Sequence, residues 1–189
     1  MAGELIEELL EGARERMAKS VESTQHEFGT VRTGRATPAL LDRVSVDYYG
    51  AITPLNQLST ISVPEARLLT VQPYDNSSIK AIEKAINESD IGMTPSNDGH
   101  LIRLVLPELT EERRRELVKV VRNLAEEGRV AIRNIRRDVM HHLRELKAEG
   151  EAGSDDEHRA EVGLQKLTDA RIAELDAVLK GKEEEILEV

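Results

Sequence analysis

The chain has 189 residues, a formal net charge of −10 and no cysteine. The lack of cysteine excludes disulfide frameworks, thiolate metal sites and thiol nucleophiles, and it fits a reducing compartment. No stretch approaches the roughly 18 apolar residues of a membrane span, and the acidic N-terminus is unlike a signal peptide. We therefore expect a cytoplasmic protein without membrane contact, rich in long helices.

The first predicted helix covers residues 1–33. Its apolar and small side chains recur at alternating spacings of three and four, as in a coiled-coil seam. The helix is expected to end near Gly34, which suits a left-handed C-terminal conformation, before Pro38, which cannot continue the helical hydrogen bonds. One amphipathic helix cannot cover its own apolar face, so it needs partners. The seam consists of Leu9, Ala13, Met17, Val21, Thr24, Phe28 and Val31.

Residues 36–106 change to the period of two that is typical of strands. The turn-rich stretch 94–99 is expected to be a connection. A short helix is expected with Ser77 as its N-cap and to end before Gly92. This region is therefore predicted to form a small α+β domain. Its expected strands are 44–48, 58–63, 68–71 and 100–106.

The segment 111–147 contains no proline and predicts one long helix, capped by Thr110. Its arginines cluster roughly 120° from its apolar stripe, at about 100° per residue. The apolar stripe consists of Leu117, Val121, Gly128, Ile132, Ile135, Val139, Leu143 and Leu146. The arginine cluster consists of Arg122, Arg129, Arg133 and Arg136, with Arg137 at its edge.

This arginine face is the candidate functional surface. Residues 111–148 hold eleven Lys and Arg against seven Asp and Glu, in an otherwise acidic chain. Guanidinium groups suit bidentate contact with phosphate oxygens, so the asymmetry favours local binding to a polyanion. A merely solvated face is the alternative. It is weakened because Arg129, Arg133 and Arg136 are not all matched by carboxylates four residues away.

A last helix is expected from Ser154, where Glu157 follows at capping-box spacing. The economical architecture is an elongated three-helix bundle, of residues 1–33 plus 108–189, interrupted by the α+β domain 36–106. Its fold class is α+β, and a hinge is predicted at 33–38 and 106–108, with Gly34, Pro38 and Pro107 as hinge residues. The last helix presents Leu164, Leu167, Leu175, Val178, Leu179 and Ile186 on one face.

No constellation for catalysis, metal or nucleotide binding emerges. The five histidines lack the spacing of a zinc site, and no phosphate-binding loop is present. With three Tyr and one Phe, a base-stacking platform is not expected, which favours recognition of structured RNA by backbone and shape. We expect no enzyme activity, cofactor, metal or small-molecule substrate.

Six motifs occur in order along nearly the whole chain, at 33–38, 47–50, 53–55, 109–114, 133–137 and 165–169. Together they resemble the ribosome recycling factor family. The resemblance implies an L-shaped factor of transfer-RNA size that binds the post-termination ribosome. With elongation factor G and GTP hydrolysis, such factors release the ribosome from mRNA by splitting it into subunits.

The resemblance also implies site residues and partners. Contacts to large-subunit ribosomal RNA are expected on the central helix and near the hinge, and elongation factor G is the expected protein partner of a monomer. Gly128 departs from the family pattern. This glycine either costs up to about 1 kcal/mol of helix stability or allows close packing between helices. A helical adaptor or chaperone-like protein is the alternative function. The implied RNA contacts are Arg129, Arg133, Arg136, Arg137, Arg32 and Arg35.

Overall fold

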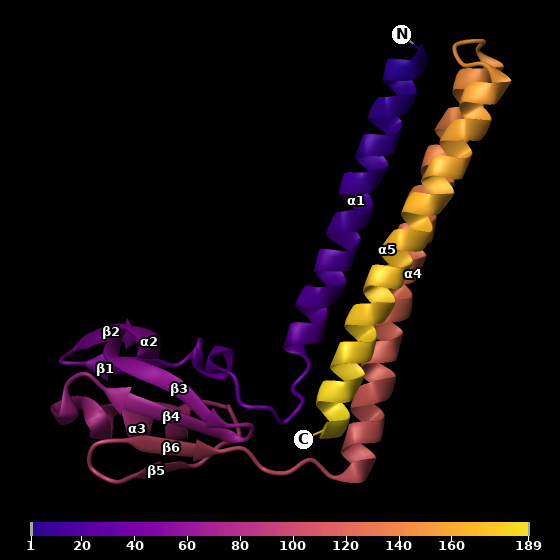
Figure 1. Cartoon of the computed structure of the whole chain (residues 1–189). Helices are drawn as coiled ribbons and strands as arrows, with labels where there is room; N and C mark the ends of the chain where they lie inside the picture. The colour runs from indigo at the N-terminus through magenta and orange to yellow at the C-terminus, as the bar shows by residue number, and fades with distance from the viewer. Residues whose placement is uncertain (1, 189) are drawn as a thin grey trace. The chain divides into compact units, whose positions relative to one another are not determined.

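The computed structural model describes residues 2–188, which divide into two compact units. The first consists of the residues up to Val31 together with Arg114–Leu187, and the second covers Arg32–Arg113. Three long helices belong to the first, and all the described strands belong to the second (Figure 1). The predicted fold class, a helical bundle interrupted by an α+β part, is confirmed.

The bundle consists of α1 (Ala2–Thr30), α4 (Glu111–Ala148) and α5 (Ser154–Glu188). The predicted apolar stripes form its core, because residues spaced three or four apart return to the same side of a helix at each turn. Fully buried members include Met17 of α1, Ile132 of α4 and Leu164 of α5.

Gly128 marks a point of close approach between the three helices. A Cβ atom built there would lie 2.4 Å from Oγ1 of Thr24 in α1 and 2.7 Å from Cδ1 of Leu175 in α5. Real Cβ atoms do not come this close to neighbouring atoms, so only glycine fits this position without a shift of Thr24 or Leu175. Of the two explanations for this glycine, close packing is therefore the right one.

The second unit holds a two-stranded and a four-stranded antiparallel sheet, the latter in the order β3-β4-β6-β5. Helix α3 (Ile79–Glu88) lies against β1 and β5 and buries Ile82 and Ile86. Two short 3-10 helices, η1 (Pro38–Leu41) and η2 (Asn76–Ser78), and the single-turn α2 (Leu55–Leu58) complete it. The strands are β1 (Ser45–Tyr48), β2 (Ala51–Pro54), β3 (Ser59–Glu65), β4 (Leu68–Pro73), β5 (Pro95–Asn97) and β6 (Ile102–Val105).

Two of these strands were not predicted. β2 pairs with β1 across a turn in which Tyr49 and Gly50 both have positive φ, 49° and 85°, as a tight hairpin requires. β5 lies at the edge of its sheet, a position at which a proline such as Pro95 is tolerated. The expectation that 94–99 is only a connection is therefore wrong.

Two predicted caps also differ from the structure. The backbone N–H of Ser77 donates to the Asp75 carboxylate, so Asp75 and not Ser77 caps the helical segment. The second is the predicted capping box of Ser154 and Glu157, since Ser154 already belongs to α5. Glu157 accepts a hydrogen bond from Nζ of Lys147 in α4, so its carboxylate links two helices. The predicted cap at Thr110 is correct, since its Oγ1 accepts from the Arg113 N–H at 3.1 Å.

Candidate nucleic-acid interface

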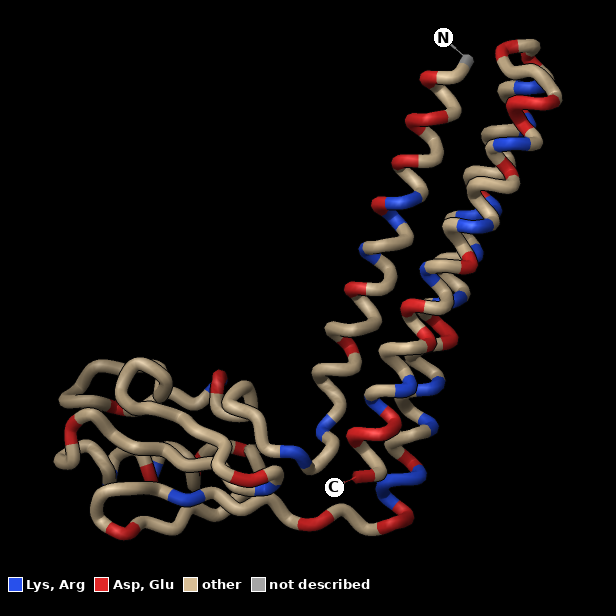
Figure 2. Tube along the Cα trace, in the orientation of Figure 1, with Lys and Arg blue, Asp and Glu red and all other residues tan. Residues whose placement is uncertain are grey.

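Helix α4 is a rigid support for the arginines predicted from the sequence. Thr110 caps its first turn, where Glu111 and Glu112 also suit the positive end of the helix dipole. Its apolar stripe is buried against the other two helices, so the backbone positions of its arginines are fixed. Figure 2 shows the basic residues recurring along this helix.

Arg129 lies at the contact between α4 and α5, with 20% of its side chain exposed. Its Nε donates to Oδ1 of Asp176 in α5 at 2.8 Å, and its Nη1 donates to Glu126 at 2.9 Å. Partial burial lowers the pKa of Arg129, but the hydrogen bonds to both carboxylates outweigh it and raise that pKa. This guanidinium joins two helices, and its charge is already compensated.

Arg133 is more accessible, with 47% of its side chain exposed. Its Nη1 contacts the other carboxylate oxygen of Glu126 at 3.2 Å. Hydrogen bonds from Arg129, and then from Arg133, lower the pKa of Glu126. Exposed ion pairs of this kind are weak, so the pair with Arg133 can open at little cost for a stronger anion.

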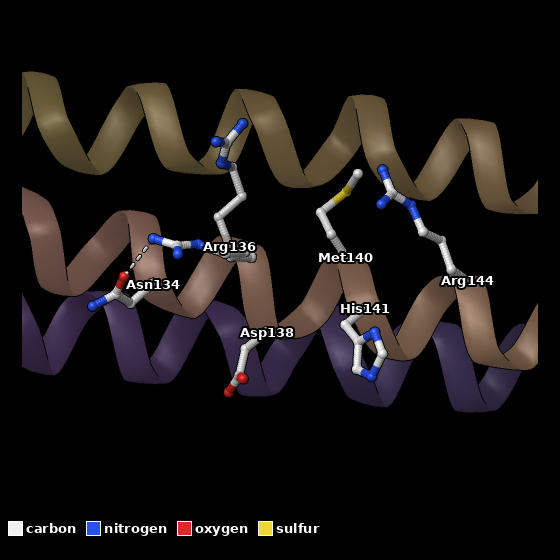
Figure 3. Close-up of a pocket in the computed structure, with 7 residues that line it drawn as sticks. Asn134, Arg136, Asp138, Met140, His141 and Arg144 are labelled. Carbon is white, nitrogen blue, oxygen red and sulfur yellow. Dashed lines mark hydrogen bonds between the residues drawn. The ribbon is translucent and has the colours of Figure 1, made fainter.

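Arg136 points toward α5 (Figure 3), where its Nη1 donates to Oε1 of Gln165 at 2.7 Å. Gln165 in turn donates to Asp169 at 2.8 Å. Among the described residues, the buried Nε of Arg136 has no hydrogen-bond partner. Arg136 is therefore oriented by a neutral amide while its charge stays uncompensated by direct contact.

Arg137 is exposed, and its Nη2 donates to Oδ1 of Asn134 at 2.8 Å. Within the part of the chain that the structure describes, it pairs with no carboxylate. The full positive charge of Arg137 is therefore available to an outside anion.

Two of these arginines have carboxylate partners at positions other than four residues away, whereas Arg136 has none among the described residues. The search at four-residue spacing missed Glu126, which lies three residues before Arg129 and seven before Arg133. It also missed Asp176, because that residue belongs to another helix. Arg129 is satisfied within the bundle, and the accessible part of the face shifts toward Arg133, Arg136 and Arg137.

An open hollow of about 660 Å³ continues this face toward the C-terminal end of α4. Arg136, Arg137 and Arg144 line it together with Met140 and His141 (Figure 3). Arg144 was not predicted from the sequence. Its side chain is 67% exposed, and its Nε lies 4.0 Å from Oε1 of Glu161. Its spacing of seven residues from Arg137 was the available signal, since that spacing returns a residue to the same helix face.

Arg32 and Arg35 belong to the second unit and are both exposed. Between them lie the buried Thr33 and Gly34, whose φ of 76° favours glycine. The conformation of this segment thus holds two guanidinium groups at the surface of the second unit.

The predicted hinge residues lie in the second unit, outside its strands and α-helices. Pro38 begins η1, and Pro107 is an exposed residue between β6 and α4. Gly34 packs on Leu109, with 3.0 Å from a Cβ built on Gly34 to the Leu109 Cγ. The hinge at 33–38 and 106–108 stays a prediction.

Two other kinds of feature are absent from residues 2–188. No group of three histidine or acidic side chains is close enough to hold a metal ion. No helix there has the length and apolarity to cross a membrane.

Comparison with known proteins identifies relatives over nearly the full length. The model of the family "Ribosome recycling factor" matches residues 24–187. A ribosome-recycling factor of Rubrobacter xylanophilus is 55% identical, over 95% of this chain and 97% of the relative. That of Bacillus subtilis is 52% identical, over 98% of this chain and 100% of the relative.

Two solved structures are also similar. A solution structure of the ribosome recycling factor has a TM-score of 0.74 at 42% identity and covers 97% of this chain and 98% of its own. The second chain has a TM-score of 0.63 at 49% identity and covers 96% of this chain and 98% of its own. This second chain belongs to models of the T. thermophilus ribosome recycling factor and the E. coli elongation factor G bound to the E. coli post-termination complex.

Proposed function

The chain belongs to the ribosome recycling factor family, and we propose that it binds the post-termination ribosome as its structural relative does. With elongation factor G and GTP hydrolysis by that factor, it releases the ribosome from mRNA by splitting it into subunits. The role of the chain itself is binding and mechanical action rather than catalysis. It acts in the cytoplasm as a monomer.

The proposed RNA contact is with the large ribosomal subunit, through the accessible arginines of α4. The observation that carries it is the uncompensated charge of Arg137 beside Arg136, on a helix whose backbone is fixed by the bundle. Arg133 joins them by releasing Glu126, and Arg144 extends the row. Arginine forks on a rigid helix match the spacing of phosphate oxygens on structured RNA.

The six residues predicted from the sequence then divide by role. Arg133, Arg136 and Arg137 contact phosphates directly, and the exposed Arg32 and Arg35 do so from the second unit. Arg129 acts differently, because its two carboxylate partners hold it against α5. It supports the RNA-binding face by fixing α4 against α5.

A subunit-splitting assay tests this proposal. Light scattering follows post-termination ribosomes mixed with the protein, elongation factor G and GTP, with each component also omitted in turn. Loss of scattering is expected only with all components present. Arg136→Ala and Arg137→Ala are expected to impair it, whereas Arg159→Ala is the matched control, because that arginine is 76% exposed on α5 and lies outside the face.

The salt dependence of ribosome binding separates phosphate contacts from other effects. Each lost phosphate contact should reduce the slope of log K against log salt by roughly one unit. We expect this change for Arg137→Ala and an unchanged slope for Arg159→Ala. If the folded wild-type protein splits no ribosomes and the arginine variants bind as it does, the adaptor alternative replaces this proposal.

A further inference from the structure

A groove runs along one side of the bundle, between the first half of α1 and the last part of α4. It encloses about 500 Å³, within the range of roughly 300–1,000 Å³ that is usual for ligand sites. Buried Ala13 and Val139 form its floor, and Leu5, Leu9 and Leu146 line its sides. We call it the α1–α4 groove.

The apolar lining of this groove is incompletely covered. Leu5 keeps 40% of its surface exposed, and Leu9 and Leu146 are half-buried. At Gly12 the wall lacks a side chain, and a Cβ built there meets no neighbouring atom within 4 Å. The groove therefore has both an apolar surface and free space for inserted side chains.

The charged residues around the groove are mainly acidic. Glu8 and Glu149 line it, and neither forms an ion pair within the described part of the chain. Glu145 also lines it, and its one described ion-pair partner is the protonated form of His141, at 3.2 Å. Arg16 is present too, but Asp138 compensates its charge at 3.0 Å. A cation at this edge would therefore meet uncompensated carboxylates.

The groove and the arginine face lie on different sides of α4. At about 100° per residue, Val139 and Leu146 point roughly 150° away from Arg133 and Arg137. The bundle can therefore hold a polyanion on one side while the groove stays open on another. Acidic edges disfavour RNA in the groove, so its partner differs in class from that of the arginine face.

We propose that the α1–α4 groove binds an amphipathic segment of another protein. A row of apolar side chains from this segment enters the space beside Leu5, Gly12 and Leu146, and its lysine or arginine side chains meet Glu8, Glu145 and Glu149. The groove follows α1 from Leu5 to Arg16, about three helical turns, or ~16 Å. A helix with apolar anchors at i, i+4, i+7 and i+11 fits that length.

A titration of the full-length protein without ribosomes tests this proposal independently of the recycling function. The probe is a synthetic leucine–lysine peptide of about 15 residues with one apolar stripe. Two control peptides are used, one with the same composition scrambled and one with glutamate in place of lysine. Amide shifts in the NMR spectrum are expected to change at 5–16 and 139–149, with the striped lysine peptide only.

The matched substitutions are Gly12→Arg in the groove and Gly181→Arg on α5. Both glycines have no neighbouring atom within 4 Å of a built Cβ, and arginine is a better helix former than glycine, so both variants are expected to fold. Gly12→Arg fills the groove and repels the lysines, so it should weaken binding about tenfold or more. Gly181→Arg adds the same charge elsewhere and should leave binding unchanged.

A second pair of variants keeps the test independent of the folding of Gly12→Arg. Glu8→Gln with Glu149→Gln should weaken binding, whereas Glu184→Gln with Glu188→Gln, at exposed positions of α5, should not. The proposal would be overturned if both pairs of variants had equal effects, if the scrambled peptide bound equally well, or if amide shifts spread over α5. Each of these results would show general attraction of the peptide to an acidic protein. Absence of binding by the striped peptide would overturn it too.

Discussion

Replacement of Gly128 by alanine sets two effects of opposite sign against each other. Alanine favours a helix interior over glycine by about 1 kcal/mol, so on helix propensity alone the variant should be more stable. The added Cβ, however, would lie 2.4 Å from Thr24 Oγ1, 2.7 Å from Leu175 Cδ1 and 3.5 Å from Thr24 Cβ. Overpacking of this kind costs about 1–3 kcal/mol.

The neighbours of Gly128 have little room to move. Thr24 is 4% exposed and its hydroxyl donates to the Ser20 carbonyl at 3.0 Å, while Leu175 is 1% exposed. Rotation of the Thr24 side chain would give up that hydrogen bond, at about 1 kcal/mol. We therefore expect Gly128→Ala to lower the free energy of unfolding by about 1–2 kcal/mol.

Urea unfolding followed by circular dichroism at the helix band measures this effect. The chain has no Trp, and its three tyrosines all lie in the second unit, so tyrosine fluorescence reports separately on that unit. Gly181→Ala, at a position without close neighbours, is the control and should raise stability by up to about 1 kcal/mol. Thr24→Ala should reduce the cost of Gly128→Ala, as a double-mutant cycle would record. Equal stabilisation by both glycine substitutions would refute the packing argument.

Three further predictions concern individual residues. Gly34→Ala should destabilise the second unit by about 1–2 kcal/mol, because Gly34 has a positive φ. The loss should exceed that of Gly92→Ala, since of these two glycines only Gly34 has a close neighbour for the added Cβ. Tyrosine fluorescence during urea unfolding measures both variants. The Asp98 carboxyl should titrate by NMR with a pKa of about 2, because it accepts hydrogen bonds from the His100 and Leu101 N–H groups and from Arg103. This pKa lies below the ordinary value of 3.8, so the Asp98 carboxylate should contribute its full stabilisation above about pH 4 and lose it as the pH falls through 2. A titration midpoint near 3.8 would contradict the geometry. Arg129→Ala should lower the unfolding free energy of the bundle by about 1–2 kcal/mol through loss of charged hydrogen bonds, more than Arg137→Ala does, and an equal effect of the two would contradict the division of roles.

The long helices could be predicted because their apolar periodicity extends over many turns. Residues such as Met17, Ile132 and Leu164 are all fully buried, as their spacing predicted. The short strands β2 and β5 were missed for the opposite reason, since three or four residues carry too little pattern. The register of β2 instead depends on two consecutive positive φ values.

The sequence could predict that the arginines of the candidate site share one face of a helix, but not which carboxylates they pair with. The spacing of Arg129, Arg133 and Arg136 placed them on one side of α4. The partner of Arg129, Asp176, lies 47 residues further along the chain, and spacing within one helix cannot detect such a pair. Similarly, the α1–α4 groove depends on how two distant helices pack, so no local pattern could indicate it.

The insertion of the second unit between α1 and α4 has a consequence during synthesis. Arg16 of α1 meets Asp138 only after 122 further residues have been added, which takes about 6–24 s at roughly 5–20 residues per second. Residues 32–113 of the second unit form one continuous stretch, which is synthesised completely within that interval. The apolar seam of α1 meanwhile has no partner, so the nascent chain passes through a stage at which Met17, Val21 and Phe28 are open to chaperones or to aggregation.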